Sequence, residues 1–536
     1  MKFSNLNKSC HLLRSIIGLI IILVICSCNQ KEIVHKDLNK EALIPVPVFT
    51  VGTGESFEIT DKTVIFTSGD FHSIEQFAQE TRNVTGHPLE ISPLTSSQSS
   101  GNMYFQIAEI ENKDSEAYEL EVSNNNLILK ANTEQGLFYG IQTIRQLMPA
   151  SIESGSLSTE NIYLASGKII DSPRFEYRGT MLDVSRHFFG VDVIKRYIDY
   201  ISSYKMNKLH LHLSDDQGWR IEIKSWPKLT EVGGLTQVGG GKGGFYTQED
   251  YKEIVRYAQS KFVTIIPEID MPGHTNAALV AYPEMNCNKK DPNPKAYSGI
   301  EVGFSTLCTR NPEVYSFLDD VIKELAAMTP GEYIHIGGDE SHVTEKEDYI
   351  YFINKVQKIV SKYGKKVLGW DDISTATLES GAVVQHWAKK ENAQKAVAQN
   401  AKVLMTPATR TYLDMQYDST TLLGLHWAAY IELDSAYIWD PATQINGVSE
   451  SQIIGVEAAL WSETIDNLNE IEYMAFPRLI GHAEIGWSPQ EGRNWNEYKF
   501  RLAKHEERMI EMGVDYYRSA LIPRDSIGGL HLNSSK

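Results

Sequence analysis

The chain has 536 residues. That is enough for two to four domains at about 150 residues each, so a single small binding module is excluded. Hydrophobic residues make up 42% and charged residues 22% of the chain, a balance typical of a folded globular protein. Lys and Arg total 51 against 69 for Asp and Glu, a net charge of −18, and this acidic balance argues against nucleic acid as a partner.

Residues 1–27 have the pattern of a secretory signal peptide: cationic residues precede the apolar run 16–25, and a small residue and Cys28 follow. The apolar run is too short to span a bilayer as a helix, which takes about 20 residues. The pattern is similar to a bacterial lipoprotein signal. We therefore expect a lipid on Cys28, export to the periplasmic face of a membrane or to the cell surface, and membrane contact only through that lipid. Cleavage at Cys26 and an ordinary signal peptide are the alternatives.

The chain after Cys28 begins with an aperiodic segment, 28–45, which is expected to be a tether. Residues 46–165 mix short β-rich runs with amphipathic helices at 74–85 and 137–148, which predicts a small N-terminal α+β domain. Within this domain the polar stretch 151–160 is expected to lead onward to the next one.

Residues 170–515 alternate short apolar runs with amphipathic helices, a pattern typical of βα units with parallel strands. Eight such units predict an α/β fold in which a (β/α)8 TIM barrel forms the catalytic domain. Residues 516–536 are expected to be a C-terminal tail. The predicted strands are 179–184, 208–213, 263–267, 333–336, 366–369, 382–385, 402–405 and 453–459.

The cysteines after Cys28 are Cys287 and Cys308, which lie in one segment of the predicted barrel. A disulfide suits an exported protein. Two free thiols fit the sequence equally well.

Acidic and aromatic residues follow every predicted strand. Barrel enzymes carry their catalytic groups at the C-terminal ends of the strands. Carboxylates provide acid/base chemistry and bind hydroxyls, whereas Trp and Tyr offer flat faces that suit the C–H face of a sugar ring. The sequence therefore predicts a carbohydrate ligand. The strand ends carry Asp183, Arg186 and His187; Asp215 and Asp216; Asp270 and His274; Asp339 and Glu340; Trp370 and Asp371; His386 and Trp387; Tyr412 and Asp414; and Trp461 and Glu463.

Several of these motifs resemble glycoside hydrolase family 20, whose members are β-N-acetylhexosaminidases. The resemblance covers about 46–515. It implies exo-acting hydrolysis of terminal β-linked GlcNAc or GalNAc from a glycan, with no metal and no cofactor. The motifs are Arg178-Gly-x-Met-Leu-Asp183-x-Ser-Arg186-His187, Leu211-His-Leu-Ser-Asp-Asp216, Pro272-Gly-His274 and Gly337-Gly-Asp339-Glu340.

Asp339 and Glu340 are adjacent, and this bears on mechanism. Conventional glycosidases hold two carboxyl groups about 5–5.5 Å or about 6.5–9.5 Å apart across the scissile bond, and neighbours on one strand end do not obviously straddle a sugar in that way. The resemblance implies instead that the substrate's own acetamido oxygen attacks the anomeric carbon, with net retention. Glu340 is then the general acid and base, and Asp339 orients the acetamide. We expect Asp339 and an aromatic pocket to raise the pKa of Glu340.

The resemblance also implies roles for the other rim residues. Asp215 and His274 would hold and tune the acid, and Asp270 lies close to His274 in the motif. The expected substrate-binding residues are Arg186, Asp414 and Glu463 for hydroxyls, Tyr412 for the acetamido carbonyl, Trp370, Trp387 and Trp461 as walls of the acetamido pocket, and Trp427 as a further platform.

Three other hypotheses fit parts of the sequence. His210 and His212 lie on one strand face and could open a zinc site, although no further strand supplies an obvious ligand set. The Gly-rich stretch 233–244 lacks the Ser or Thr that a phosphate-binding loop carries after its Lys. A surface carbohydrate-binding lipoprotein without catalysis would also use Trp and acidic residues, but a pure binder has no use for the Asp339-Glu340 pair. The natural glycan and the oligomeric state stay open.

Overall fold

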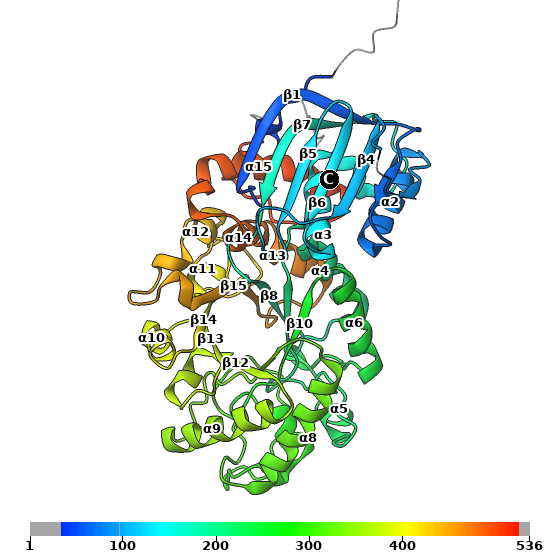
Figure 1. Cartoon of the computed structure of the whole chain (residues 1–536). Helices are drawn as coiled ribbons and strands as arrows, with labels where there is room; N and C mark the ends of the chain where they lie inside the picture. The colour runs from blue at the N-terminus through cyan, green and yellow to red at the C-terminus, as the bar shows by residue number, and fades with distance from the viewer. Residues whose placement is uncertain (1–33, 96, 525–536) are drawn as a thin grey trace, which may run out of the picture.

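The computed structural model describes residues 34–95 and 97–524. The predicted signal peptide and Cys28 lie outside the described residues. Figure 1 shows an N-terminal sheet with its helices packed against one end of a closed barrel. Among the described residues, none of the helices has the length and apolar character needed to cross a membrane.

The N-terminal domain is a seven-stranded mixed sheet with the order β1-β7-β5-β6-β4-β2-β3. Helix α3 packs on β4, β5 and β6, and α2 packs on α3, so the apolar faces of both helices bury a common core. Thr133 caps α3 by accepting from Gly136 N. The elements are η1 (Leu38–Lys40), β1 (Phe49–Ile59), β2 (Ile65–Thr67), α2 (His72–Thr85), β3 (Ile91–Pro93), β4 (Asn102–Ile107), β5 (Tyr118–Val122), β6 (Asn126–Ala131), α3 (Glu134–Leu147), η2 (Ala150–Ser154) and β7 (Ile162–Asp171).

Strand β7 extends this sheet beyond the expected domain end at residue 165. It pairs antiparallel with β1 and β5 and runs to Asp171. The described part of the expected tether, residues 34–45, also belongs to the fold rather than to a free linker, because Leu38, Leu43 and Ile44 are buried. This apolar triplet has no periodicity, so the sequence pattern did not reveal that it packs.

The eight predicted barrel strands are all present and close in the order expected of a TIM barrel, with β8 paired to both β9 and β15. The fold prediction is therefore confirmed. The strands are β8 (Tyr177–Asp183), β9 (Lys208–His212), β10 (Thr264–Glu268), β11 (Tyr333–His335), β12 (Lys366–Trp370), β13 (Val383–His386), β14 (Lys402–Met405) and β15 (Ile453–Leu460).

Amphipathic helices surround the barrel, and their apolar stripes join one large core with the outer faces of the strands. A capping box at Thr247 and Asp250 begins α6. The helices are α4 (Val191–Ser203), α5 (Lys228–Glu231), α6 (Gln248–Ser260), α7 (Asn276–Ala281), α8 (Pro312–Met328), α9 (Lys346–Lys362), α10 (Lys390–Ala398), α11 (Ala408–Thr411), α12 (Leu433–Tyr437), α13 (Leu468–Ala475), α14 (Arg478–Trp487) and α15 (Trp495–Glu511), with short 3-10 turns η3 (Val238–Gly240), η4 (Pro283–Met285), η5 (Asp371–Thr375), η6 (Pro441–Thr443), η7 (Glu450–Gln452) and η8 (Gln490–Gly492).

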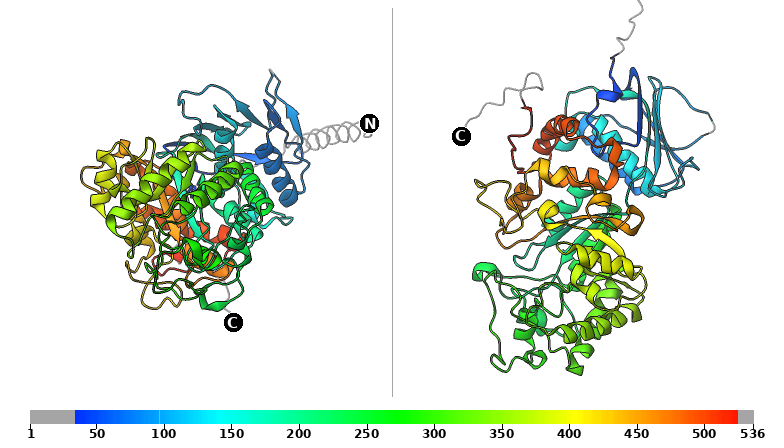
Figure 2. Two further views of the ribbon diagram at one scale, coloured as in Figure 1. Left: turned by 90° about the horizontal axis from the view of Figure 1, so that it is seen from below. Right: turned by 90° about the vertical axis from the view of Figure 1, so that its left-hand side faces the viewer.

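The C-terminal helix α15 bridges the two domains, and Figure 2 shows it in red beside the N-terminal domain. The described part of the expected tail, up to residue 524, packs onto the barrel. Ser519 and Ile522 are buried, and Arg524 pairs with Glu506 of α15. The fold therefore continues beyond the end expected at residue 515.

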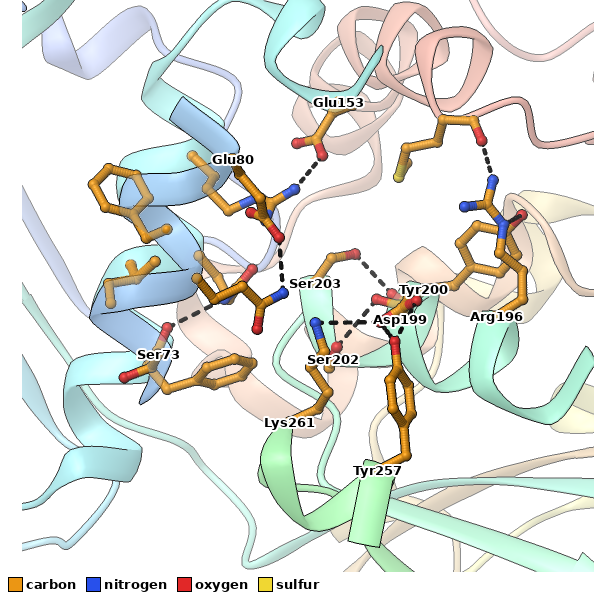
Figure 3. Close-up of a pocket in the computed structure, with 17 residues that line it drawn as sticks. Ser73, Glu80, Glu153, Arg196, Asp199, Tyr200, Ser202, Ser203, Tyr257 and Lys261 are labelled. Atoms are coloured by element: carbon orange, nitrogen blue, oxygen red, sulfur yellow. Dashed lines mark hydrogen bonds and ion pairs between the residues drawn. The ribbon is translucent and has the colours of Figure 1, made fainter. Parts of the chain in front are cut away.

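A polar cavity of about 360 Å³ lies between the two domains, and Figure 3 shows its walls. Most of its charged side chains pair with one another: Arg145 pairs with Glu80 and Glu153 of the N-terminal domain, and Lys261 pairs with Asp199 of the barrel. Side chains of both domains line this cavity, and none of the predicted site residues is among them.

Candidate active site

The predicted acid pair lies directly after β11, on a sharp turn made by Gly337 and Gly338. Both glycines have positive φ, 62° and 106°. A Cβ on Gly337 would lie 1.8 Å from Asp270 Oδ1, so only glycine fits there. Glu340 and His274 are themselves left-handed, with φ of 43° and 53°. Such conformations cost energy in non-glycine residues and concentrate at functional sites.

A cavity of about 200 Å³ opens at this end of the barrel. The structure brings together nearly all of the predicted substrate-binding residues around it. Trp370 lies beneath the lining, 1% exposed, and packs against Trp461 with the rings tilted by 36° and their centres 5.6 Å apart. The lining consists of Arg186, Ile300, Val302, Asp339, Glu340, Trp387, Tyr412, Asp414, Leu425, Trp427, Trp461 and Glu463.

His274 joins the acid pair to Asp215. Its Nε2 lies 3.5 Å from Glu340 Oε2 and 3.8 Å from Asp339 Oδ2, and its Nδ1 lies 3.1 Å from Asp215 Oδ1. Burial alone would lower the pKa of His274, but the charge of Asp215 and the hydrogen bond to it raise that pKa well above its ordinary value. His274 is therefore an imidazolium at neutral pH, and both carboxylates face the same nitrogen from one side of the cavity.

Asp339, in the cavity lining, forms a second acidic pair with Asp270 beneath it. Burial raises the pKa of Asp339 to about 6, with His274 and a hydrogen bond from Asp270 acting in the opposite direction. Burial and the charge of Asp339 raise the pKa of Asp270 still further. One proton therefore stays on Asp270 at neutral pH, where it can donate to an ionised Asp339.

Glu340 behaves differently from what the sequence predicts. Burial favours its neutral form, but the hydrogen bond and charge of His274 outweigh burial, and Arg186 adds to them, so the pKa of Glu340 falls below its ordinary value. The expected upward shift is therefore wrong for the unliganded site. The physical reason is the proton on His274, whose position relative to Glu340 depends on the folded chain.

Several polar atoms at the cavity have no hydrogen-bond partner among the described residues. They include Arg186 Nε, Asp414 Oδ1, Trp461 Nε1 and Glu463 Oε2. Arg186 is fixed by Asp215 at 2.9 Å and lies over the Trp461 ring at 4.8 Å. Burial and the charge of Glu463 raise the pKa of Asp414 well above its ordinary value. Buried polar atoms left without partners are costly, and a ligand rich in hydroxyls would satisfy them.

Aromatic rings form the cavity walls. Between ring centres, Tyr412 lies 6.1 Å from Trp461 and 5.9 Å from Trp427. The ring centres of Trp387 and Trp427 are 6.2 Å apart. Trp427 is 57% exposed, so its face is available at the mouth, whereas Trp461 is buried among the walls. This arrangement can enclose one sugar ring and leave a platform outside it.

A disulfide between Cys287 and Cys308 closes the segment that brings Ile300 and Val302 to the cavity. The Cα atoms are 5.0 Å apart, within the range for a disulfide, so the bridge is present where the sequence left two free thiols equally open. Sequence reasoning missed both apolar residues, since no motif covers this loop, and it also missed Leu425.

His210 and His212, which raised the zinc hypothesis, face carboxylates in the structure. His212 Nε2 lies 2.8 Å from Asp215 and its Nδ1 2.5 Å from Glu268. His210 contacts Glu268 at 3.0 Å and Glu457 at 2.9 Å. The two imidazoles thus belong to a buried network of acids and bases below the cavity.

Comparison with known proteins agrees with this geometry. Residues 175–490 match the catalytic domain of glycosyl hydrolase family 20, and residues 40–172 match domain 2 of that family. The chain is 39% identical over 485 residues to a beta-N-acetylhexosaminidase of Cellulomonas fimi, covering 89% of this chain and 96% of that protein.

Solved structures are similarly close. The beta-N-acetylhexosaminidase from Streptomyces coelicolor A3(2) superposes with a TM-score of 0.86 at 46% identity, over 90% of this chain and 98% of that one. A mutant Streptomyces plicatus beta-hexosaminidase in complex with its product GlcNAc gives a TM-score of 0.87 at 45% identity, over 90% and 97%. Both domains and the arrangement of the strands are thus shared along nearly the whole length, and the chain belongs to glycosyl hydrolase family 20.

Proposed function

We propose that this protein is an exo-acting β-N-acetylhexosaminidase that removes terminal β-linked GlcNAc or GalNAc from glycans. The observation that carries the proposal is the Asp339-Glu340 pair, which faces His274 beneath a small aromatic cavity. Family membership supports the same activity. The free polar atoms of Arg186 and Glu463 supply partners for sugar hydroxyls.

The two steps of the proposed reaction together use the acetamido group, one water and these two carboxyl groups. Asp339 orients the acetamide so that its oxygen attacks the anomeric carbon, while Glu340 protonates the departing glycosidic oxygen. An oxazolinium intermediate forms as the glycosidic bond breaks. Water then attacks the anomeric carbon, and the bond from that carbon to the acetamido oxygen breaks. Glu340, now an anion, takes the proton from this water, so the acid is restored and the configuration is retained.

The lowered pKa of free Glu340 fits this scheme because His274 holds a proton 3.5 Å away. A bound sugar removes water from the cavity, and desolvation acts on Glu340 in the direction that favours its neutral form. His274 thus favours the charged form of Glu340 and carries the proton that Glu340 needs when it acts as the acid.

A paired measurement tests the activity. We expect rapid hydrolysis of an aryl β-N-acetylglucosaminide, no hydrolysis of the matching aryl β-glucoside, and inhibition by an N-acetyl thiazoline. Glu340→Gln should lower kcat by several orders of magnitude, since general acid catalysis and its following base step are both lost, while the sugar still binds. Equal cleavage of both glycosides, or of neither, would contradict the proposed mechanism, and the latter result would favour the non-catalytic binding protein.

We also propose that the mature protein is a lipoprotein, exported and attached to a bacterial membrane through Cys28. The cationic start, short apolar run and Ser27-Cys28 sequence support this proposal. Expression with labelled palmitate checks it: label should be lost in Cys28→Ala and kept in Cys26→Ala. If the label is instead lost in Cys26→Ala and kept in Cys28→Ala, the lipid is on Cys26 and the cleavage site lies two residues earlier.

A further inference from the structure

The inside of the barrel below the cavity contains a network of buried acids and imidazoles, and Glu268 lies at its centre. Its side chain is fully buried. Oε1 accepts from Trp370 Nε1 at 2.9 Å and lies 2.9 Å from His335 Nδ1. Oε2 lies 2.5 Å from His212 Nδ1 and 3.0 Å from His210 Nε2. One carboxylate thus contacts side chains from β9, β11 and β12.

Two branches lead from Glu268 to the cavity. The first passes through His212 to Asp215, whose carboxylate contacts Arg186 at 2.9 Å and His274 at 3.1 Å. The second passes through Trp370, which packs against Trp461 in the cavity wall. The first branch ends at the proposed acid and the second at the proposed acetamido wall.

We infer that Glu268 is a positioning residue for both halves of the reaction: one carboxylate oxygen orients Trp370, and the other keeps His212 in the charged form that fixes Asp215. The inference rests on the proposed function. Glu268 touches no substrate and acts entirely through these two neighbours.

The charge on His212 follows from its contacts. Both ring nitrogens face carboxylate oxygens, and a neutral imidazole has only one N–H to donate. Burial lowers the pKa of His212, but Glu268 and Asp215 raise it well above its ordinary value. The other charged groups that face His212 are Asp183 and Arg186 from the end of β8, and the Trp461 ring meets its edge.

The groups that face Glu268 come from the same barrel interior. His210, His212 and His335 contact its carboxylate directly, and Asp270 lies two residues beyond it, just after β10 ends. Glu457, on β15, contacts His210 but neither His212 nor Trp370; its partners are His210 Nδ1, Gln385 Nε2 and Tyr177 OH. Glu457 is equally buried and lies outside both branches, so it provides a matched control.

Glu268→Gln should change the branch through His212 and preserve the branch through Trp370. The amide oxygen can still accept from Trp370, while the amide N–H2 faces His212 and removes the need for an imidazolium. We expect KM for the aryl β-N-acetylglucosaminide to stay within about threefold, kcat to fall about tenfold or more, and the alkaline limb of the pH profile to move down by about one unit, because the charged form of His212 has lost a counter-charge. Glu268→Ala, which also frees Trp370, should raise KM as well.

Glu457→Gln removes the same charge at the same depth. We expect its thermal stability to drop as in Glu268→Gln, with the alkaline limb unmoved within about 0.3 unit. A merely structural role for Glu268 predicts that the two variants behave alike. A wild-type profile in Glu268→Gln, or the same shift in Glu457→Gln, would overturn the inference.

Histidine ¹⁵N NMR tests the charge without using activity. The signal of His212 is assigned as the one that is lost in His212→Gln. At neutral pH we expect this signal to be that of an imidazolium in the wild type and that of a neutral imidazole in Glu268→Gln. A neutral His212 in an active wild-type enzyme would overturn the inference alone. A wild type that hydrolyses no glycoside but keeps a charged His212 would instead overturn the proposed function.

Discussion

Asp339 and Glu340 are neighbours in the chain, yet their surroundings shift their proton affinities in opposite directions. Asp339 is nearly fully buried, and burial dominates its pKa. Glu340 reaches further toward the cavity, where the imidazolium of His274 dominates. Two adjacent carboxyl groups can therefore do different work at one pH.

The raised pKa of Asp339 predicts the acidic side of the activity profile. The proposed role requires the anion, which is lost as the pH falls through about 6. We expect kcat/KM, which reports the free enzyme, to decline below about pH 6 and to stay high above it until the imidazolium groups of His212 and His274 lose their protons at alkaline pH. A profile that remains flat down to pH 4 would show that Asp339 works without its charge.

Asp270 offers a second test at the level of single residues. The protonated carboxyl group of Asp270 donates a hydrogen bond to Asp339, and the amide of an asparagine can donate one in the same way. Asp270→Asn should therefore keep kcat within about tenfold of the wild type, whereas Asp270→Ala, which leaves Asp339 unsupported, should lose at least about a hundredfold. Equal losses in both variants would mean that the carboxyl group itself is needed. Steady-state kinetics with the aryl substrate distinguishes the two results.

Which residues gather at the site could be predicted from the sequence, but their protonation could not. Every predicted binding residue lies at or just beneath the cavity, since strand ends in a barrel share one rim. The direction of the Glu340 pKa depends on a distance to His274 across two strand ends, and no spacing in the sequence gives that distance. Glu268 also follows a predicted strand, but no motif singled it out, and His212 was considered only as a possible zinc ligand.

At the level of elements, periodicity predicted what is long and regular. All eight barrel strands carry enough apolar residues to be recognised. Strand β3 has only three residues, and none of them is buried, so it shows neither a period of two nor an apolar run. Strand β7 follows a polar connection and includes Ala165, Ser166 and Gly167, which have weak strand propensity, so its place in the sheet depends on pairing with β1 and β5.

The loop closed by Cys287 and Cys308 allows a prediction at this scale. The bridge closes a segment with a sequence separation of 21, which in the chain-entropy model stabilises the fold by about 3 kcal/mol. Cys287→Ser should lower the urea midpoint correspondingly. It should also raise KM more than it lowers kcat, because Val302 and Ile300 line the cavity whereas the acid pair lies on another strand end.

Reduction of the wild type with dithiothreitol provides the control for that variant. Reduced wild type and Cys287→Ser should show the same KM, and the oxidised wild type alone should keep the lower value. An unchanged KM in both would show that the loop holds its position through packing.

At the scale of the whole molecule, a buried cluster locks the two domains together. Lys205 of the barrel donates to Asp171 Oδ2 at 3.0 Å and to Tyr118 OH at 2.9 Å of the N-terminal domain. Trp487 adds a hydrogen bond to Asp171 and lies under the Lys205 ammonium at 4.6 Å. Removing one partner of a buried ion pair leaves an uncompensated charge.

Lys205→Met should therefore destabilise the protein by about 3–5 kcal/mol and leave kcat/KM at 25 °C close to the wild-type value, since the cluster lies far from the cavity lining. Urea unfolding monitored by tryptophan fluorescence measures the first effect, and the aryl substrate the second. The double variant Lys205→Met/Asp171→Asn should regain part of the loss because no charge is left unpaired. A double variant less stable than the single one would contradict the ion-pair account.

The N-terminal domain meets the barrel where the strands begin, through Arg178 and Asn207, and the cavity opens where the strands end. A molecule attached to any support by its N-terminal side would thus point its mouth outward. If the protein is coupled to beads through its N-terminal domain, the cavity of every copy faces the solution. Glycans on particles too large to pass between the protein and the bead could then still enter the cavity.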